Sequence, residues 1–457
     1  MSKKIIYLLS LLMALSLVFA GCKKASTAPT GEGPTKEDEV KPPTNLGTTG
    51  LMPDLTELDK YKEKPIQRST VVAKYENKNY MRNPVITVVG GSTVVVFYEI
   101  RYQTPGAGND VALTGENAVS IAYVQSTDSG INFSTVGVGE PKFVGGAPSK
   151  SAADAHGAPI VFNTGKEIVV VASAGIGLSS GVYNGTDKVS KLQYSVAPIT
   201  DNKVGDFSEW KDIADPAKKG SYQQFGTHSA RGTVVNGTLL LPVTLATYPG
   251  GDANLNSSVF GYVLYKGTVG SNNEVTWNEV SAKAIDMPRD GTKETRIPKG
   301  TSESDYIALA VNAQTTRLYK GKGQNAVPAQ TPIVGSDGSA GTLVVPNWQG
   351  ATSYDPSSYA NSGTPQSILS HVLALEQNLA IRLVDSDFAN QQGSSFALGD
   401  AYEKNAKSSS MDVLKDGTIV MIAEGGKVEG ADAASRPFYI YFSRFSQAYI
   451  ANKTSGK

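Results

Sequence analysis

Hydrophobic and polar positions repeat along the chain as one unit: an apolar run rich in β-branched residues, a short polar turn and a second apolar run. Four clear copies are PVITVVGGSTVVVFYE at 84–99, APIVFNTGKEIVVVAS at 158–173, RGTVVNGTLLLPVTLA at 231–246 and MDVLKDGTIVMIAEGG at 411–426. Asn-Gly and Asp-Gly between apolar runs are strong signals for β-hairpins. Because helical periodicity is scarce, the pattern predicts an all-β protein.

Two weaker copies extend the series, IPKGTSESDYIALAVN at 297–312 and SGTPQSILSHVLAL at 362–375. The turns then recur about six times, roughly every 55 to 75 residues, which is the spacing of blades in a β-propeller. Continuous apolar runs such as Val94–Phe97 suit strands that are covered on both faces. Periodicity alone leaves a β-sandwich open as the alternative.

The N-terminus has the pattern of an export signal. Lys3 and Lys4 precede an apolar run from Ile5 to Ala20, which is short for a membrane span and predicts a signal peptide over residues 1–21. The sequence VFAGC resembles a bacterial lipobox, with Phe19 where leucine is usual. This implies a lipid on Cys22 and a place in the bacterial cell envelope, on the outer surface. The alternative is an ordinary signal peptide with an incidental cysteine.

Residues 22–66 have the composition of a disordered tether, rich in Pro, Gly, Thr, Lys and Glu. The folded part is therefore expected at residues 67–457. Cys22 is the only cysteine, so no intrachain disulfide can form. Lys plus Arg and Asp plus Glu number 42 each, a balance that gives no reason to expect a nucleic-acid partner. No metal-ligand spacing and no phosphate-binding glycine loop is found, so no cofactor is expected.

Several motifs resemble one family, the bacterial sialidases (neuraminidases). STDSGINF at 126–133 resembles an Asp-box (BNR repeat), a β-turn in which the Asp accepts backbone N–H bonds and the Gly takes a positive φ. The others, in the family's order, are MRNPVITV at 81–88, FYEIR at 97–101, GTHSARGTVVNGTLLLPV at 226–243, and SSSMDVLKDGTIVMIAEGG at 408–426 with FYIYFSRFS at 438–446.

The resemblance implies a six-bladed β-propeller of the sialidase type, acting as an exo-α-sialidase on terminal sialic acids of glycoconjugates. Sialidases bind the sugar's carboxylate with three arginines, whose guanidinium groups are always charged and can bond it bidentately. They use a tyrosine nucleophile, a glutamate that takes its proton, and an aspartate as acid/base, and so depart from the two-carboxylate scheme of other glycosidases.

The first blade matches the family well. Arg82 corresponds to the first arginine of the triad, and Arg101 corresponds to an accessory arginine. Asp110 is the only aspartate in the loop that carries the family's acid/base, and Glu116 is a competing carboxylate. Glu294 corresponds to the glutamate that activates the tyrosine, with a lysine in place of the family's preceding asparagine.

The later blades depart from the family. Gln314 stands near the expected second arginine, so Arg317 is the candidate substrate ligand, with Arg296 as an alternative. Glu376 occupies the position of the third arginine, although Asn378 and Arg382 of that segment are kept.

The nucleophile is also displaced. Ser408 falls at the tyrosine position, and Tyr402, six residues earlier, needs an insertion to act as nucleophile. These departures keep two further hypotheses open beside a surface sialidase: a non-catalytic, adhesin-like propeller that binds sialylated glycans, and a glycosidase for a sugar without a carboxylate.

Overall fold

The computed structural model describes about 250 of the 457 residues, those at 63, 65–72, 79–102, 112–133, 141–178, 190–214, 224–235, 237–247, 259–279, 285–287, 292–296, 305–311, 316–322, 325–328, 342–344, 367–374, 377–384, 391–398, 406–425 and 439–454. Between residues 280 and 378 it describes strand backbones alone. Cys22, Asp110, Gln314, Glu376 and Tyr402 lie outside the described residues.

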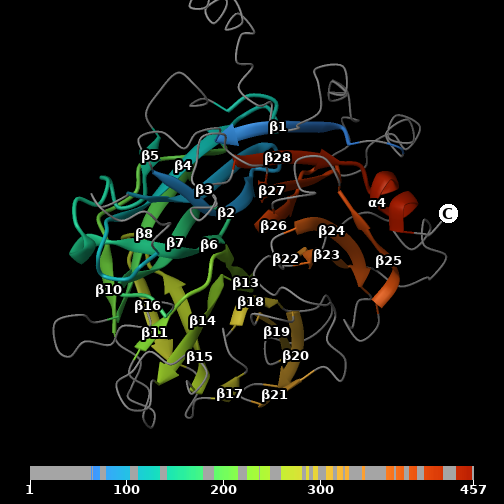
Figure 1. Ribbon diagram of the computed structural model, residues 1–457. Coiled ribbons are helices and arrows are strands. Elements are labelled where there is room, and N and C mark those ends of the chain that lie inside the picture. Colours follow the sequence, from blue (N-terminus) through green and yellow to red (C-terminus); the bar gives the residue numbers. More distant parts are fainter. Residues whose placement is uncertain are drawn as a thin grey trace, which may run out of the picture.

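The described strands form six sheets (Figure 1). The first holds β2 (Tyr80–Val89), β3 (Thr93–Arg101), β4 (Val119–Ser126) and β5 (Lys142–Phe143). The second holds β6 (His156–Asn163), β7 (Glu167–Gly175), β8 (Ser190–Thr200), β9 (Lys203–Val204), β10 (Lys211–Ile213) and β12 (Ala230–Arg231). The third holds β11 (Gln224–Gly226), β13 (Thr233–Val235), β14 (Thr238–Thr247), β15 (Val259–Val269), β16 (Val275–Glu279) and β17 (Ile285–Met287).

The remaining three sheets complete the series. The fourth holds β18 (Thr292–Arg296), β19 (Asp305–Val311), β20 (Thr316–Lys322) and β21 (Asn325–Pro328), and the fifth holds β22 (Thr342–Val344), β23 (Ser367–Ala374), β24 (Gln377–Val384) and β25 (Gln391–Ala397). The last sheet holds β26 (Ala406–Val413), β27 (Ile419–Gly425), β28 (Tyr439–Phe445) and β1 (Gln67–Val72). In the described part, the helices are η1 (Ala152–Asp154) and α4 (Gln447–Thr454), so the prediction of a nearly all-β chain is confirmed.

The four clear hairpins form where the sequence places them. Gly91, Gly165, Gly237 and Gly417 all have φ between 78° and 86°, a left-handed conformation that glycine adopts without a steric penalty. The two weaker units each hold one strand, β19 in 297–312 and β23 in 362–375. Their antiparallel partners, β18 and β22, precede those units in the chain, so the two hairpins do not lie where the sequence places them. Strand β12 was not predicted from the sequence. It pairs in parallel with β6 of the second sheet, and it separates β11 from β13, which both pair with β14 of the third sheet.

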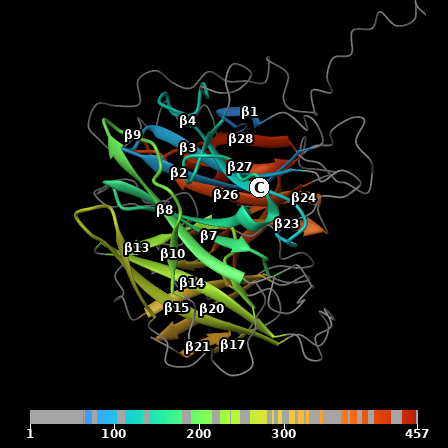
Figure 2. The ribbon, with the colours of Figure 1, turned by 90° about the vertical axis from the view of Figure 1, so that its left-hand side faces the viewer.

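Strands β2, β6, β18, β22 and β26 lie toward the middle of the molecule, whereas β5, β10, β21, β25 and β1 lie at the periphery (Figure 1). Figure 2 shows the first, second and third sheets following one another down the molecule. The inner strands contact each other in turn, β26 with β2, β2 with β6, and β12 with β18. This is a series of sheets around a centre, and not the two stacked sheets of a sandwich.

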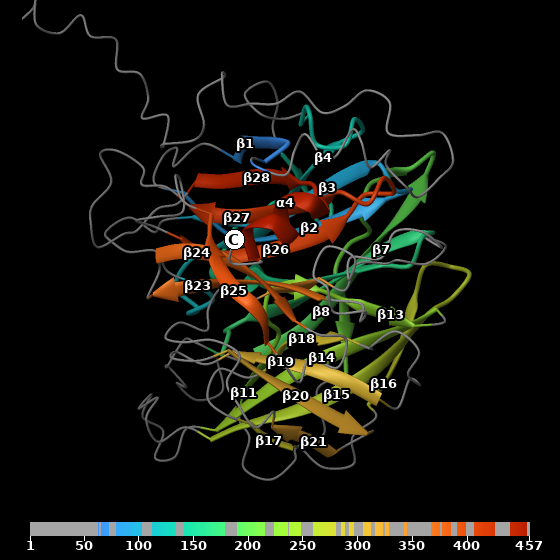
Figure 3. The same ribbon diagram turned by 90° about the vertical axis from the view of Figure 1, so that its right-hand side faces the viewer.

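The two ends of the folded part meet in the last sheet. Strand β1 pairs with β28 in antiparallel register, and the backbone N–H of Ile66 donates to Arg444 O at 2.9 Å. After β28, α4 packs on β24 and β25 (Figure 3), with the rings of Phe445 and Tyr449 stacked at 5.5 Å. No helix in the described ranges is long and apolar enough to cross a membrane.

The inner edge of β2 is satisfied by side chains of the last sheet. An edge strand presents unpaired N–H groups that need partners when buried. The N–H of Ile86 donates to Ser410 Oγ at 3.2 Å, and the N–H of Val88 donates to Asp412 Oδ2 at 2.7 Å. The polar residues of β26 therefore hold the first sheet against the last.

The turn at 126–133 is closed by its own side chains. Gly130 N donates to Ser126 Oγ at 2.9 Å, and Asn132 N donates to Asp128 Oδ1 at 2.9 Å. Burial alone would raise the pKa of Asp128, but hydrogen bonds from Ser126 and Asn132 hold it below its usual value. Phe133 packs edge-on against Phe442 at 5.4 Å, so the turn also covers the last sheet.

A cross-molecule ion pair ties the second sheet to the last. Arg231 on β12 donates through Nη1 to Met411 O at 2.8 Å, and its Nη2 lies 2.9 Å from Asp412 Oδ1. Asp412 also accepts from Val88, near the turn end of β2, so this contact lies at the opposite end of β2 from Arg82. One guanidinium therefore connects the inner strands of three sheets.

We expect Arg231→Met to lower the free energy of unfolding by about 2 kcal/mol, because Asp412 would keep its largely buried charge without the guanidinium. Arg231→Lys keeps the charge but loses the two-point contact, and should fall between Met and wild type. Denaturant unfolding of the three proteins gives the comparison. A Met variant as stable as wild type would contradict this role for the pair.

Candidate functional site

The arginines Arg82 and Arg101 lie at the same end of the β2–β3 hairpin, away from its turn. Arg82 is opposite Glu99 in the register, and Arg101 is opposite Tyr80. A β-bulge follows Arg82, where Asn83 has φ of 53° and Pro84 succeeds it. Both arginines are buried, with 5% and 8% of their surface exposed. Buried guanidinium groups need carboxylate or hydrogen-bond partners, and both have them.

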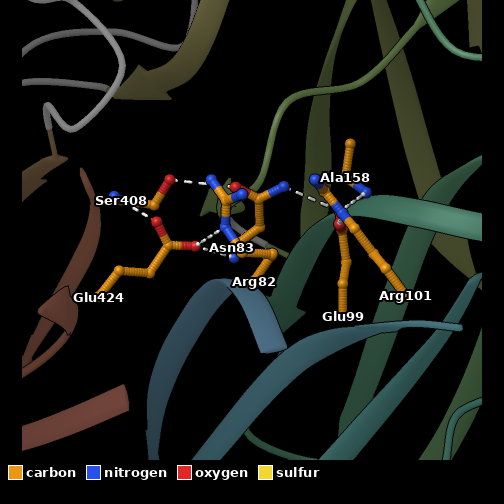
Figure 4. A network of polar contacts seen from close by, with 7 residues as sticks. All are labelled: Arg82, Asn83, Glu99, Arg101, Ala158, Ser408 and Glu424. Carbon is orange, nitrogen blue, oxygen red and sulfur yellow. Dashed lines mark hydrogen bonds and ion pairs between the residues drawn. The ribbon is translucent and has the colours of Figure 1, made fainter. Parts of the chain in front are cut away.

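Arg82 is paired with Glu424, which comes from β27 of the last sheet (Figure 4). Arg82 Nε donates to Glu424 Oε1 at 3.0 Å, and the backbone N–H groups of Asn83 and Ser408 donate to the same carboxylate at 2.6 and 3.0 Å. Burial alone would raise the pKa of Glu424, but the Arg82 guanidinium and these two N–H groups hold it below its usual value. Glu424 is therefore an ionised, fully enclosed anchor for Arg82.

Arg101 is paired with Glu99 in the same way. Arg101 Nε donates to Glu99 Oε2 at 2.7 Å, while Ala158 N and Asn83 Nδ2 donate to Oε1 at 2.6 and 3.0 Å. Burial lowers the pKa of Arg101, although the neighbouring Glu99 partly restores it. Each arginine thus faces a carboxylate that two further donors hold in place, which fixes the position of both cations.

Hydrogen bonds from a backbone N–H of one sheet to a buried side-chain oxygen of the neighbouring sheet join successive sheets. Glu424 of the last sheet accepts from Asn83 N of the first, and Glu99 of the first accepts from Ala158 N of the second. Ser173 Oγ of the second then accepts from Thr227 N, which follows β11 of the third, at 2.8 Å. Asn83 and Ala158 both precede a proline and both have φ near 50°. The carboxylates that hold the two arginines therefore also accept the hydrogen bonds that join the first sheet to its neighbours.

Ser408, which was aligned from the sequence with the tyrosine of sialidases, lies within this network. Its side chain donates to Asn83 Oδ1 at 3.0 Å, and its residue is 6% exposed. A serine hydroxyl without an adjacent base is a poor nucleophile. In the described residues, the groups that contact Ser408 are an amide and a carboxylate already bonded to Arg82, so its position supports a role in holding the network.

The structure brings together only part of the predicted site. Arg82 and Arg101 share one network, whereas Asp110 and Tyr402 lie outside the described residues. Glu116 is exposed. Glu294 lies on β18 opposite Leu309, and Arg317 lies on β20 opposite Ala310, so both belong to the fourth sheet.

Asn83, Glu99 and Glu424 belong to the site but were not predicted from the sequence. A signal existed for each: Asn83 directly follows Arg82, Glu99 is two residues before Arg101, and Glu424 lies within the motif MIAEGG. What could not be read is that Glu424, more than 300 residues away in the chain, reaches Arg82. In the residues with described positions, no cluster of three or more metal-ligating side chains occurs.

His156, at the start of β6, contacts β8 and the residue that precedes β10. Its ring stacks on Trp210 with centroids 4.2 Å apart, and its Nε2 lies 2.6 Å from Gln193 Oε1. Burial lowers the pKa of His156, although the hydrogen bond to Gln193 partly offsets this. The histidine is therefore packed as a neutral side chain against Trp210 and Gln193.

This predicts a pH dependence of stability. The unfolded chain binds a proton on His156 at a pH where the folded chain does not, so the free energy of unfolding should fall as the pH drops below about 6.5. Denaturant unfolding at pH 7.5 and 5.5 tests this, with His156→Gln expected to show a smaller difference. The carboxylates with lowered pKa titrate below this window. An equal difference in both proteins would exclude His156 as the cause.

The fold is similar to that of sialidases. No protein-family model and no curated protein sequence matches this chain. Trypanosoma rangeli sialidase in complex with sialic acid is similar with a TM-score of 0.57 and 14% identity, over 84% of this chain and 60% of that one. The intramolecular trans-sialidase from Ruminococcus gnavus, in complex with oseltamivir carboxylate, has a TM-score of 0.57 and 11% identity over 84% and 98% of the two chains.

The hemagglutinin-neuraminidase ectodomain of parainfluenza virus 5 has a TM-score of 0.51 and 10% identity, over 97% of this chain and 98% of that one. The chain spans 60% of the length of the Trypanosoma rangeli protein. It therefore has a sialidase-like β-propeller fold. At such identities the likeness shows the fold alone, and function has to be argued from the site.

Proposed function

We propose that this protein acts on the terminal sialic acids of glycoconjugates as a sialidase-like propeller of six blades. The observation that carries the proposal is the fixed pair of buried arginines, Arg82 and Arg101, at one end of the first hairpin. A sialic acid presents a carboxylate beside its reacting carbon, and guanidinium groups bind carboxylates with charge-assisted hydrogen bonds. The structural neighbours include a sialidase in complex with sialic acid, which supports the same ligand class here.

In the hydrolytic form of this proposal, Asp110 is the acid/base, Tyr402 the nucleophile and Glu294 the group that takes its proton. Arg317 supplements Arg82 and Arg101 at the carboxylate. No cofactor takes part. The turn at 126–133, with its hydrogen bonds to Asp128, is proposed as an Asp-box. The signal over residues 1–21, a lipid on Cys22 and the tether at 22–66 place the propeller on the envelope surface.

A second candidate function is a non-catalytic propeller that binds sialylated glycans. One observation favours it: Ser408, in the position that the family gives to its tyrosine, is buried and bonded to Asn83. A propeller that kept Arg82 and Arg101 but lost its nucleophile would hold a sialic acid without cleaving it.

The experiment is release of a fluorophore from an α-sialic acid glycoside, run beside binding of the protein to sialylated and desialylated glycans. Arg82→Lys is the test variant, because it leaves a cation beside Glu424 but cannot bond a carboxylate bidentately. Hydrolysis by wild type, reduced about 100-fold in Arg82→Lys, would support the sialidase. Binding without hydrolysis would support the second candidate. Neither binding nor hydrolysis would refute both.

A further inference from the structure

Asn83 lies between the two arginine–glutamate pairs (Figure 4). Its backbone N–H donates to Glu424 Oε1 at 2.6 Å, and its side-chain Nδ2 donates to Glu99 Oε1 at 3.0 Å. Its Oδ1 accepts from Ser408 Oγ at 3.0 Å. One residue therefore touches the carboxylate that holds Arg82 and the carboxylate that holds Arg101.

The backbone alone does not require this side chain. Asn83 has a left-handed φ of 53°, which asparagine tolerates better than most residues. Ala158, in the corresponding bulge of the second sheet, has φ of 51° without any polar side chain. The N–H of Ala158 still reaches its glutamate at 2.6 Å. The hydrogen bond from the backbone N–H to the glutamate therefore does not need the Asn83 side chain, and the side-chain amide of Asn83 adds further hydrogen bonds to it.

Because Glu99 and Glu424 are buried, the hydrogen bonds of the Asn83 side chain affect the stability of both ion pairs. Glu99 and Glu424 are 2% and 0% exposed, and in such surroundings hydrogen bonds strengthen one another while unpaired polar groups are costly. A displacement of either glutamate would cost a hydrogen bond to Asn83 and so disturb the other pair. The two arginines then have one common support.

We propose that Asn83 is a positioning residue that couples the Arg82–Glu424 pair to the Arg101–Glu99 pair, so that both arginines meet a ligand's carboxylate as one rigid unit. The ligand part of this proposal rests on the proposed function, whereas the coupling between the pairs does not.

Asn83→Gly is the clean deletion, because glycine adopts the left-handed φ without strain and keeps the N–H to Glu424. Ala158→Gly is its matched control, since it makes the same backbone change at the corresponding bulge and removes no polar group.

The binding arm is a double-mutant cycle. Affinity for an α-sialic acid glycoside is measured for wild type, Arg82→Lys, Arg101→Lys and the double variant, and then again in the Asn83→Gly and Ala158→Gly backgrounds. We expect the two lysine substitutions to be non-additive by about tenfold in wild type and in Ala158→Gly, and additive within about twofold in Asn83→Gly. General destabilisation would not produce this pattern.

The second arm needs no ligand. The same cycle is measured in the unfolding equilibrium constant, where the coupling should again be about tenfold and should again depend on Asn83. If wild type binds no sialic acid glycoside, the proposed function fails, and this arm alone decides the coupling. A coupling that survives in Asn83→Gly, or that is absent in wild type, would overturn the proposal.

Discussion

Replacing Arg82 by methionine is expected to lower the free energy of unfolding by about 3 to 5 kcal/mol, because it leaves a buried carboxylate without its cation. Glu424 is 0% exposed and, in the folded chain, stays ionised beside Arg82. Two backbone N–H groups would still bond Glu424, but they carry no full charge. The same variant should lose measurable binding of sialic acid glycosides, since the first carboxylate ligand of the proposed site is gone. Denaturant unfolding and a glycan-binding assay measure the two effects.

The controls separate stability from binding. Arg82→Met combined with Glu424→Gln removes both charges and should recover about half of the lost stability or more, without recovering binding. Arg231→Met destabilises the centre of the molecule at the other end of β2 and should leave the affinity unchanged. Restored binding in the double variant would remove Arg82 from the ligand site. An Arg82→Met protein as stable as wild type would remove the ion pair from the fold.

Substituting alanine for Gly130 is expected to cost about 3 to 5 kcal/mol, because two separate penalties combine at this position. Gly130 has φ of 89°, a conformation that disfavours any Cβ. A Cβ built there would lie 2.2 Å from Phe442 Cζ, so the ring beneath the turn would have to move. Phe442 is fully buried against Phe133 and the first sheet, which leaves it little room. Thermal or denaturant unfolding measures the loss.

Gly165→Ala is the matched control for Gly130→Ala. Gly165 has φ of 86° in the turn of the β6–β7 hairpin, but no atom lies within 4 Å of its built Cβ. It should therefore show the backbone penalty alone, about 1 to 2 kcal/mol. The difference between the two variants is the cost of displacing Phe442. Equal losses would mean that the ring moves aside freely.

Much of the fold could be predicted because its signals are local. Runs of β-branched residues around Asn-Gly, Asp-Gly and Gly-Gly turns specify hairpins, and the turn glycines adopt the expected left-handed φ. Strand β12 could not be predicted, because its parallel pairing with β6 depends on a close approach. Gly232 N donates to Val161 O at 2.7 Å, and a Cβ on Gly232 would collide with Phe162. Such an approach depends on where the second sheet lies in space.

The site was predictable only where one hairpin carries it. Arg82 and Arg101 flank a single hairpin, so a motif could place them at one end of it. Glu424 pairs with Arg82 across the boundary between the first and last sheets. This ion pair could not be predicted, because it forms only when the last sheet packs beside the first. Asn83 directly follows Arg82, but the sequence does not show which groups its side chain contacts. Its amide became part of the site only because the side chain of Glu99 faces the second sheet.

Because β1 pairs with β28, the first and last strands of the folded part are neighbours. The strands could therefore keep their places in space even if the chain began at a different strand. Lys453 Nζ lies 3.6 Å from Glu63 Oε2, so the two ends of the folded part are neighbours. A short linker could join residues 454 and 63, and the chain could be opened at the exposed turn around Gly237, whose built Cβ has no neighbour. Such a circular permutant is expected to keep every sheet. The two ends that now meet only through the pairing of β1 with β28 would then also be joined by a covalent linker.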